Sequence, residues 1–345
     1  MRRIGIVVAL AVAMTTAGSA PAAGHREVAG TTWARTQLPG LCGRAGDWCG
    51  ATANGINDRG QIVGSADLTR NVEGVYHAVL WDGGRIRDLG ALGGRRSGAT
   101  DLNERGTVVG WSYTRNAVQR AVVWQSGRIR NLGTLPGRYP GSRKRTSAAF
   151  AINDRAQIVG DSTVWASGAW HQRPVIWDNG RIRSLPLLRG DRDGGATAIN
   201  EFGDVVGWSA PDTNRIGASL HAVLWRNGRA QDLGVRTDYG GGSINDRGQI
   251  VTSSGRLLND RMQTNLCALV RSPCSANALN NLGQIVGYEA PAEDSLFESG
   301  VLWQAGGAER FDAFWLTDIN ERGEIVEWAY EGHGVPDRAY VWRPS

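Results

Sequence analysis

The sequence predicts an all-β protein that folds as a seven-bladed β-propeller with four-stranded blades, and three observations predict it. A phrase first seen at residues 56–64 occurs seven times along the 345 residues. Each copy precedes short apolar stretches and tight turns, which is the pattern of four short strands repeated about every 45 residues. The 48 Gly disfavour helices, whereas the 14 Trp favour strands.

Each repeat is marked by an Asn that opens a turn between its first two strands. The first copy reads Ile-Asn-Asp-Arg-Gly-Gln-Ile-Val-Gly. Asn and Asp bond to their own backbone and Gly adopts a positive φ, so this phrase is typical of a turn. The marker residues are Asn57, Asn103, Asn153, Asn200, Asn245, Asn280 and Asn320.

Two further phrases supply the third and fourth strands of each repeat. Residues 77–81, His-Ala-Val-Leu-Trp, begin the third-strand series, and residues 85–90, Arg-Ile-Arg-Asp-Leu-Gly, begin the fourth. The Asp-Asn-Gly at residues 178–180 favours a tight hairpin between them. The third-strand Trp recurs once in each regular repeat, which indicates core packing. The fifth repeat lacks this Trp and is irregular.

The two ends of the chain are expected to complete one blade together. The last repeat stops after its third strand, at Trp342, and residues 37–43 align with residues 184–190 around a fourth strand. The N-terminal strand therefore closes the last blade and pairs edges that would otherwise stay open. We expect a single propeller domain over residues 31–345.

Residues 1–22 have the order of a secretory signal peptide. Arg2 and Arg3 precede an apolar run over residues 4–14, and small residues follow up to a cleavage site after Ala22. The alternative is an uncleaved membrane anchor, for which the run is too short. Residues 23–30 form a lead-in. We predict a protein secreted through a Sec-type signal peptide, with no stable membrane span after cleavage.

The four cysteines predict two disulfides. In an exported protein, an even number of neighbouring cysteines is typical of disulfide pairing. Cys42 pairs with Cys49, and Cys267 pairs with Cys274, where the bridge supports the irregular fifth blade. A metal site is the alternative, but neither pair has the Cys-x-x-Cys spacing with a nearby His. We predict no metal and no cofactor.

The repeated phrases resemble the bacterial extracellular HAF repeat, which is named for the His-Ala-Phe of its third-strand phrase. This chain has His-Ala-Val at residues 77–79 and 221–223, and the resemblance covers about residues 51–342. The resemblance implies an exported bacterial repeat protein. It implies no activity and no catalytic residues.

A binding face is expected where the long and varied loops lie, after the second and fourth strands of each repeat, because binding residues concentrate on loops held by a rigid scaffold. Eight residues after the marker Asn, four of the seven repeats carry an aromatic residue, and a nearby loop adds two Trp and a His. Aromatic rings at such a rim suit stacking on sugars, and packing between blades is the alternative. These ligand-binding candidates are Trp111, Trp208, Tyr288, Trp328, Trp165, Trp170 and His171.

A basic loop supplies the remaining ligand-binding candidates, Tyr139, Arg143 and Arg145. Arg clusters bind carboxylate, sulfate or phosphate. A solvated loop is the alternative. Removal of Arg2 and Arg3 lowers the net charge from +5 to +3, and this mild charge disfavours a nucleic-acid partner.

We expect a monomeric, non-catalytic binding protein whose partner is an extracellular glycan, a cell-wall polymer or a protein. The sequence contains no nucleophile elbow, zinc-protease motif or phosphate-binding loop. An extracellular polysaccharide hydrolase or lyase is one alternative, with Asp101 or Asp161 as its carboxylate. A surface scaffold for protein interactions is the other.

Overall fold

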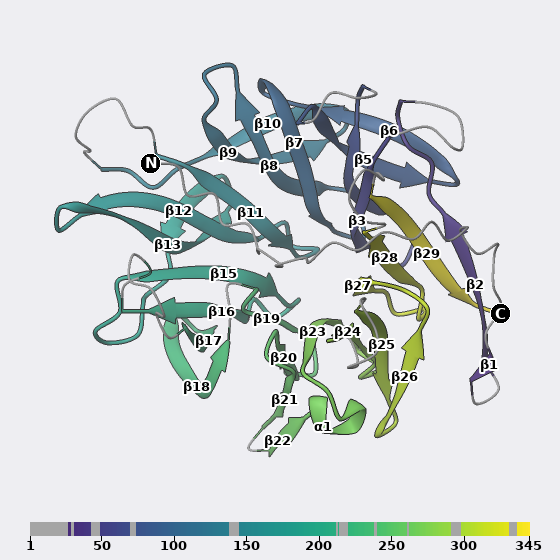
Figure 1. Cartoon of the computed structure of the whole chain (residues 1–345). Coiled ribbons are helices and arrows are strands. Elements are labelled where there is room, and N and C mark those ends of the chain that lie inside the picture. The colour runs from purple at the N-terminus through teal and green to yellow at the C-terminus, as the bar shows by residue number, and fades with distance from the viewer. Residues whose placement is uncertain are drawn as a thin grey trace, which may run out of the picture.

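The computed structural model describes the backbone of residues 27–28 and residues 31–42, 49–69, 74–137, 145–211, 213, 220–237, 240–260, 262–290, 298–330 and 337–345. Within them the fold is all-β apart from one helical turn, α1 (Cys267–Val270). The predicted signal peptide lies outside the described residues. Figure 1 shows the sheets arranged around a common centre.

The strands of each repeat occupy four successive positions, and neighbouring positions pair antiparallel. The first strands are β3 (Ala51–Ile56), β7 (Gly93–Leu102), β11 (Ser147–Ile152), β15 (Asp193–Ile199), β19 (Gly242–Ile244), β23 (Cys274–Leu279) and β27 (Trp315–Ile319). The second strands are β4 (Ile62–Asp67), β8 (Val108–Thr114), β12 (Ile158–Ala166), β16 (Val205–Ala210), β20 (Ile250–Thr252), β24 (Ile285–Glu289) and β28 (Ile325–Ala329).

The outer two positions complete the sheets. The third strands are β5 (Tyr76–Asp82), β9 (Gln119–Gln125), β13 (Ala169–Asp178), β17 (Leu220–Arg226), β21 (Arg256–Asn259), β25 (Ser299–Gln304) and β29 (Arg338–Pro344). The fourth strands are β6 (Arg85–Gly90), β10 (Arg128–Gly133), β14 (Arg181–Ser184), β18 (Arg229–Thr237), β22 (Met262–Asn265) and β26 (Gly307–Phe311). The first two repeats share one sheet because Tyr76 and Arg96 form a parallel bridge.

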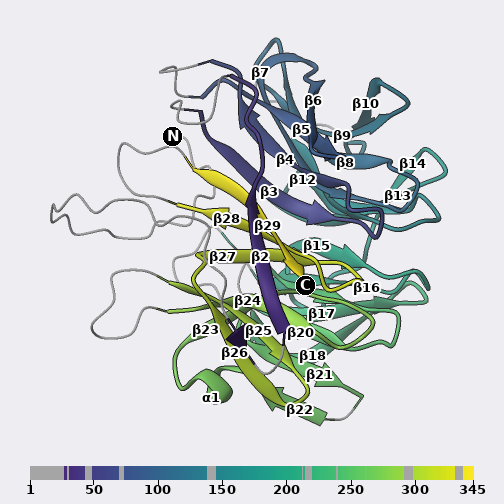
Figure 2. The ribbon, with the colours of Figure 1, turned by 90° about the vertical axis from the view of Figure 1, so that its right-hand side faces the viewer.

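The N-terminal strand pairs with the last strand of the chain. β2 (Thr31–Gln37) runs antiparallel to β29, from Trp33 opposite Pro344 to Gln37 opposite Tyr340 (Figure 2). A two-residue strand, β1 (Glu27–Val28), pairs with the start of β2 in a hairpin. Residues 23–30 were predicted only as a lead-in, because a two-residue strand leaves no recognisable pattern in the sequence.

The marker Asn side chains join each repeat to the next. Each Asn is buried, and its Oδ1 accepts backbone N–H groups of its own turn, as Asn57 does from Arg59 and Gln61. Its Nδ2 donates to the backbone oxygen of the following marker Asn at 3.0 to 3.2 Å, and Asn320 donates to Asn57. The seven bonds therefore form a cycle.

A second cycle runs through the residue after each marker. Its backbone N–H donates to the side-chain oxygen of the corresponding residue in the next repeat at 2.7 to 2.9 Å, and the last bond runs from Glu321 to Asp58. The first strands contact one another in the same order, and β27 contacts β3. Buried polar groups of the turns are thus satisfied between repeats.

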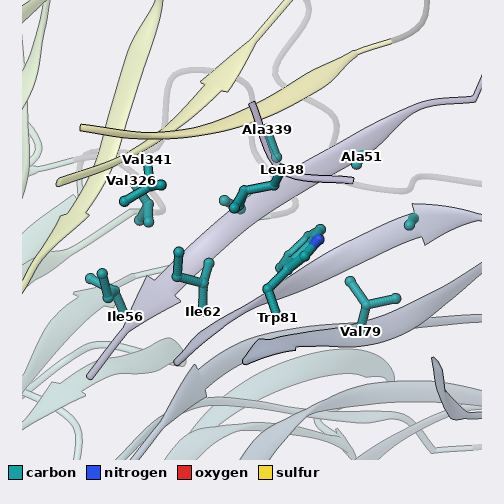
Figure 3. Close-up of a cluster of buried hydrophobic side chains, with 11 residues drawn as sticks. Leu38, Ala51, Ile56, Ile62, Val79, Trp81, Val326, Ala339 and Val341 are labelled. Atoms are coloured by element: carbon teal, nitrogen blue, oxygen red, sulfur yellow. The ribbon is translucent and has the colours of Figure 1, made fainter. Parts of the chain in front are cut away.

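Apolar side chains fill the spaces between neighbouring sheets. Figure 3 shows the cluster between the last and first repeats, where Leu38 lies near Trp81 and Ile62, and Val326 and Val341 come from the other side. Trp81 is buried, as are Trp225 and Trp303 at the same position of other repeats. This agrees with the core role predicted for the third-strand Trp.

Both predicted disulfides form. Cys42 bonds to Cys49, and Cys267 bonds to Cys274. The second bridge spans α1 and lies beside the short strands β19–β22 of the fifth repeat. Two disulfides fit an extracellular protein.

Candidate functional site

Several aromatic and acidic side chains lie where the second strands end and the third strands begin, at the opposite end of the sheets from the marker Asn turns. Asp67 ends β4 and pairs in register with Tyr76 at the start of β5. Trp328 precedes the end of β28 and pairs with Trp315, which begins β27. The sheet register therefore gathers side chains of separate loops at one end.

The first group joins the first two repeats. Trp111 lies edge-on to Tyr76 and to Tyr113, with ring centroids 6.0 and 5.8 Å apart. Arg96 Nε donates to Gly74 O at 2.8 Å, and its guanidinium lies 5.8 Å from the centre of the Tyr76 ring. All three aromatic rings are partly exposed.

Trp111 can lie flat against the sheet because its cross-strand neighbour is Gly98. A Cβ on Gly98 would lie 2.9 Å from the Trp111 ring, closer than such contacts allow. The missing side chain therefore creates the space that the indole occupies. The same relationship recurs between Gly195 and Trp208.

The second group joins the sixth and seventh repeats. The rings of Trp315 and Trp328 pack 4.5 Å apart, and Tyr288 lies edge-on to Trp315 at 6.3 Å. Trp315 Nε1 donates to the carboxylate of Glu298, which stands just before β25. These aromatic rings are also partly exposed.

Asp67 and Asp337 connect the two groups. Asp67 Oδ2 accepts the Gly50 N–H at 2.8 Å, and the Ala51 N–H donates to Asp337 O at 2.9 Å. Both carboxylates are partly exposed, and they lie near enough for the charge of Asp67 to raise the pKa of Asp337. We call the whole set the aromatic–carboxylate band. Its members are Tyr76, Trp111, Tyr113, Tyr288, Trp315, Trp328, Asp67, Arg96, Glu298 and Asp337.

The carboxylates of the band hold protons more tightly than usual. Burial raises the pKa of Asp67, and the Gly50 N–H lowers it in part. Burial also raises the pKa of Glu298. For Asp337, burial raises the pKa, the neighbouring Trp328 indole lowers it, and the charge of Asp67 raises it further. Such groups can accept hydroxyl hydrogens and can also deliver a proton.

Tyr76 stands between the basic and acidic members. Burial raises the pKa of its phenol, the charge of Arg96 lowers it, and Tyr113 and Asp67 raise it. The phenol therefore stays protonated and available as a hydrogen-bond donor at neutral pH.

Two of the aromatic-face candidates are buried and cannot meet a ligand without rearrangement. Trp208 is 2% exposed and packs in a cluster with Ala210 and Leu220. His171 is 3% exposed, and its Nδ1 lies 3.2 Å from Asp193 Oδ1. The prediction that His171 lies in a variable loop was wrong, because this part of the chain continues as a strand.

Trp165 and Trp170 lie on strands and not on the predicted loop. β12 and β13 pair without interruption as far as Ala166 opposite Ala169, which places Trp165 directly opposite Trp170. Their partly exposed rings meet edge-on at 5.6 Å. Cross-strand aromatic pairs stabilise such ribbons, which explains why the hairpin is longer than its counterparts.

The basic loop is described only in part. Tyr139 and Arg143 lie outside the described residues. Arg145 Nη1 donates to Gly137 O at 2.9 Å, and Arg145 O accepts from Arg120 Nη1 at 2.6 Å. Arg145 is thus engaged in holding the two ends of this loop together.

Both carboxylates considered for catalysis are held by hydrogen bonds within the protein, with Asp161 buried and Asp101 partly exposed. Asp101 accepts the Leu102 and Ile152 N–H groups at 2.7 and 2.8 Å, and burial raises its pKa to about 7. Asp161 accepts from Gln172 Nε2 at 2.6 Å, and burial raises its pKa to about 7 as well. Asp101 thus bridges the second and third repeats through backbone groups.

Metal-binding groups and membrane-spanning helices are both absent from the described residues. None of their His, Cys, Asp and Glu side chains gather in groups of three or more that could hold a metal ion. Among the same residues, no helical segment has the length and apolar character needed to cross a bilayer.

The fold resembles those of solved β-propellers. The β-propeller domain of the trilobed protease from Pyrococcus furiosus, described as having an open velcro topology, superposes with a TM-score of 0.53 at 9% identity, over 85% of this chain and 93% of that one. The acylaminoacyl peptidase of Pyrococcus horikoshii gives 0.52 at 12% identity, over 86% of this chain and 52% of the peptidase.

At these identities the likeness shows the fold alone, an all-β fold of the β-propeller class. The chain corresponds to about half the length of the acylaminoacyl peptidase. No protein-family model matches the sequence, and no curated protein is similar to it in sequence.

Proposed function

We propose that this chain is an exported, seven-bladed β-propeller that binds a glycan at the aromatic–carboxylate band. The observation that carries the proposal is the juxtaposition of partly exposed rings with half-buried carboxylates around Asp67 and Asp337. The two hydrogen-bond cycles support seven blades in a closed ring, with β2 as the outer strand of the last blade. The likeness to HAF repeats and the N-terminal segment support export.

A sugar matches both components of the band. Sugar rings present C–H faces that pack on aromatic rings, while their hydroxyl groups need hydrogen-bond acceptors and donors. Trp111 and Trp328 supply ring faces, and Asp67 and Asp337 supply acceptors between them. Small-molecule sites combine an apolar, often aromatic lining with a few placed polar groups, and the band contains both.

Hydrolysis is the second candidate function, and the Asp67–Asp337 pair favours it. Glycosidases use two carboxyl groups, of which one is protonated at working pH. Burial raises the pKa of both residues, and the charge of Asp67 raises the pKa of Asp337 further. On this mechanism, the protonated carboxyl would donate to the leaving oxygen and the ionised one would act as the base or nucleophile.

Co-sedimentation with bacterial cell walls, cellulose, chitin and mannan tests the binding proposal. The protein secreted from the full-length gene should begin at Ala23 by mass, and it should be retained by at least one polymer. Trp111→Ala and Trp328→Ala should each weaken retention about tenfold, as loss of a central aromatic contact does. Trp165→Ala is the matched control, because it removes a partly exposed Trp outside the band.

The outcomes separate the readings. Retention that is unchanged in Trp111→Ala and Trp328→Ala but lost in Trp165→Ala would move the site to the β12–β13 hairpin. New reducing ends that disappear in Asp67→Asn or Asp337→Asn would establish hydrolysis. No retention on any polymer, with all variants folded, would refute glycan binding.

A further inference from the structure

A cavity lies where the two ends of the chain meet, far along the sheets from the aromatic–carboxylate band. We call it the seam cavity. It has a volume of about 360 Å³ and lies between residues 36–39, which end β2 and follow it, and the turns of the first repeat. The last repeat closes it with Val341 and Arg343 of β29. Figure 3 shows Leu38, Trp81 and Ile62 of this region.

Positive charge dominates the lining of the seam cavity. Arg59 and Arg322 come from the marker turns of the first and last repeats, and Arg343 comes from the last strand. Glu324 is the acidic residue among the lining side chains, which leaves a net charge of +2 from three Arg and one Glu. The floor is apolar, with Trp81 donating its indole N–H to Pro39 O at 2.8 Å.

Both carboxylate oxygens of Glu324 accept hydrogen bonds, whereas Arg59 has no acidic partner within the described residues. Glu324 accepts from Arg343 Nε at 2.9 Å and from Arg322 and Asn320. Burial raises the pKa of Glu324, but these hydrogen bonds outweigh it, so its pKa lies below the usual value. Within the described part of the chain, the Arg59 guanidinium forms no ion pair. The cavity therefore keeps unneutralised positive charge.

The corresponding groove between the first and second repeats lacks this excess. It has a volume of about 210 Å³, and Gly106, Val108 and Trp124 occupy the places of Gly60, Ile62 and Trp81. Its charged lining residues are Arg87 and Asp88, which cancel. The greater volume and the excess positive charge thus distinguish the seam cavity from this groove.

We propose that the seam cavity binds a small anionic group, a carboxylate, sulfate or phosphate, through Arg59 with Arg322 and Arg343. Arg guanidinium groups form strong, directed hydrogen bonds with all three anions. Because the lining comes from both ends of the chain, the bound anion stabilises the pairing of β2 with β29. The inference does not depend on what the aromatic–carboxylate band binds.

Thermal unfolding tests the proposal with sodium sulfate, sodium phosphate and sodium citrate as probes, each compared with sodium chloride at equal ionic strength. A ligand that binds only the folded protein raises the Tm in a saturable way. Calorimetric titration of the full secreted protein gives the affinity for each anion and so distinguishes carboxylate from sulfate and phosphate. Arg59→Ala should weaken binding about tenfold, the effect of losing one charge-assisted contact.

Arg105→Ala is the matched control, because Arg105 holds the position of Arg59 in the next repeat and does not line the seam cavity. Both variants should unfold like the unmodified protein in chloride. Sulfate and phosphate also stabilise proteins by exclusion from their surface, but that effect is unsaturable and equal in all three proteins. If Arg59→Ala responds like Arg105→Ala to every anion, the proposed site is refuted. If anions bind without slowing amide exchange in β2 and β29, the coupling is refuted.

Discussion

Arg35 and Glu327 join the N-terminal strand to the last repeat through a buried ion pair. Arg35 Nη2 and Nε lie 2.6 and 2.9 Å from the two carboxylate oxygens of Glu327. Glu327 is fully buried and also accepts from Trp342 Nε1 at 2.8 Å. The Arg35 guanidinium lies 3.7 Å from the centre of the Tyr340 ring. A buried carboxylate of the last repeat thus depends on a strand that precedes the first one.

We predict that Arg35→Met lowers the free energy of unfolding by about 3–5 kcal/mol at neutral pH, because it leaves Glu327 buried without its cation. Burial already raises the pKa of Glu327, and Arg35 is the main opposing influence. Without Arg35 the carboxyl takes up a proton more readily, so the loss should shrink as the pH falls. Urea unfolding at pH 4.5 and 7.5 measures both effects.

The double variant Arg35→Met/Glu327→Leu is the control for that prediction. Replacing both partners of a buried pair by apolar residues is often neutral, so much of the stability should return. An unchanged urea midpoint for Arg35→Met alone would contradict the assigned role of the N-terminal strand.

Because the marker Asn bonds form a cycle, replacing the Asn that joins the last repeat to the first should cost as much unfolding free energy as replacing one elsewhere. Asn320→Ala and Asn245→Ala each remove one bond to the next repeat and three bonds within the turn. Each should cost about 4 kcal/mol, at roughly 1 kcal/mol per hydrogen bond. Chemical denaturation of the two variants measures the difference directly.

This comparison tests ring closure and blade number together. If the first and last repeats do not meet in solution, Asn320 lacks its bond to Asn57, and Asn320→Ala should destabilise the protein by about 1 kcal/mol less than Asn245→Ala. Asp58→Ala provides the same comparison for the second cycle, because the backbone N–H of Glu321 donates to its carboxylate.

The strands were predictable because each phrase recurs with its own turn. Residues 85–90 form β6 as predicted, since the hairpin and the Arg-Ile-Arg alternation recur in the next repeats. The role of Asp58 was not predictable beyond its turn. Its bond partner is Glu321, 263 residues away, and only the meeting of the chain ends brings the two together.

Residues of the candidate site could be predicted only where they occupy the same position, relative to the marker Asn, in several repeats. Trp111, Tyr288 and Trp328 stand eight residues after a marker Asn, and the structure keeps them partly exposed. Trp208 has the same position, but Leu220 covers it, which no periodic pattern reveals. Tyr76 and Trp315 were missed. They begin strands at positions that are not aromatic in the other repeats, so repetition gave no signal.

We predict that the Cys267–Cys274 disulfide affects stability locally, in the fifth repeat. A Cβ on Gly255 would lie 2.3 and 2.7 Å from the two sulfur atoms, so the bridge lies directly over this residue. Gly255 also has a φ of +69°, which an L residue adopts only with strain. Gly255→Ala should therefore destabilise the protein, and less so when both cysteines are Ser. A double-mutant cycle followed by thermal unfolding measures this coupling.

Removing the bridge should itself cost about 2.5 kcal/mol from loop-closure entropy. Amide exchange should rise first in the fifth repeat, because its strands are the shortest and it lacks the third-strand Trp. Equal changes in all repeats would show that the bridge does not act locally.

We predict that Asp101 and Asp318 lower the free energy of unfolding as the pH rises from about 4 to about 7. Burial raises the pKa of both carboxyls from 3.8 to about 7, and for Asp318 the charge of Asp101 adds to the effect. A folded-state pKa above the unfolded one favours folding at low pH, and that contribution is lost as the pH passes the folded value. Asp318 Oδ2 accepts the Ile56 N–H at 2.9 Å, so the carboxyl also links the last repeat to the first.

The size of this effect is bounded, and Asn variants isolate it. The change from 3.8 to about 7 corresponds to at most about 4 kcal/mol per carboxyl, and less because both side chains keep some access to water.

Asp318→Asn keeps an oxygen for the Ile56 N–H but cannot ionise. Relative to the unmodified protein, it should gain stability between pH 4 and pH 8 in urea titrations. Asp101→Asn should also weaken the pH dependence that remains at Asp318, because it removes the neighbouring charge. A constant difference between variant and unmodified protein across that range would mean that both carboxyls ionise as freely in the folded protein as in the unfolded chain.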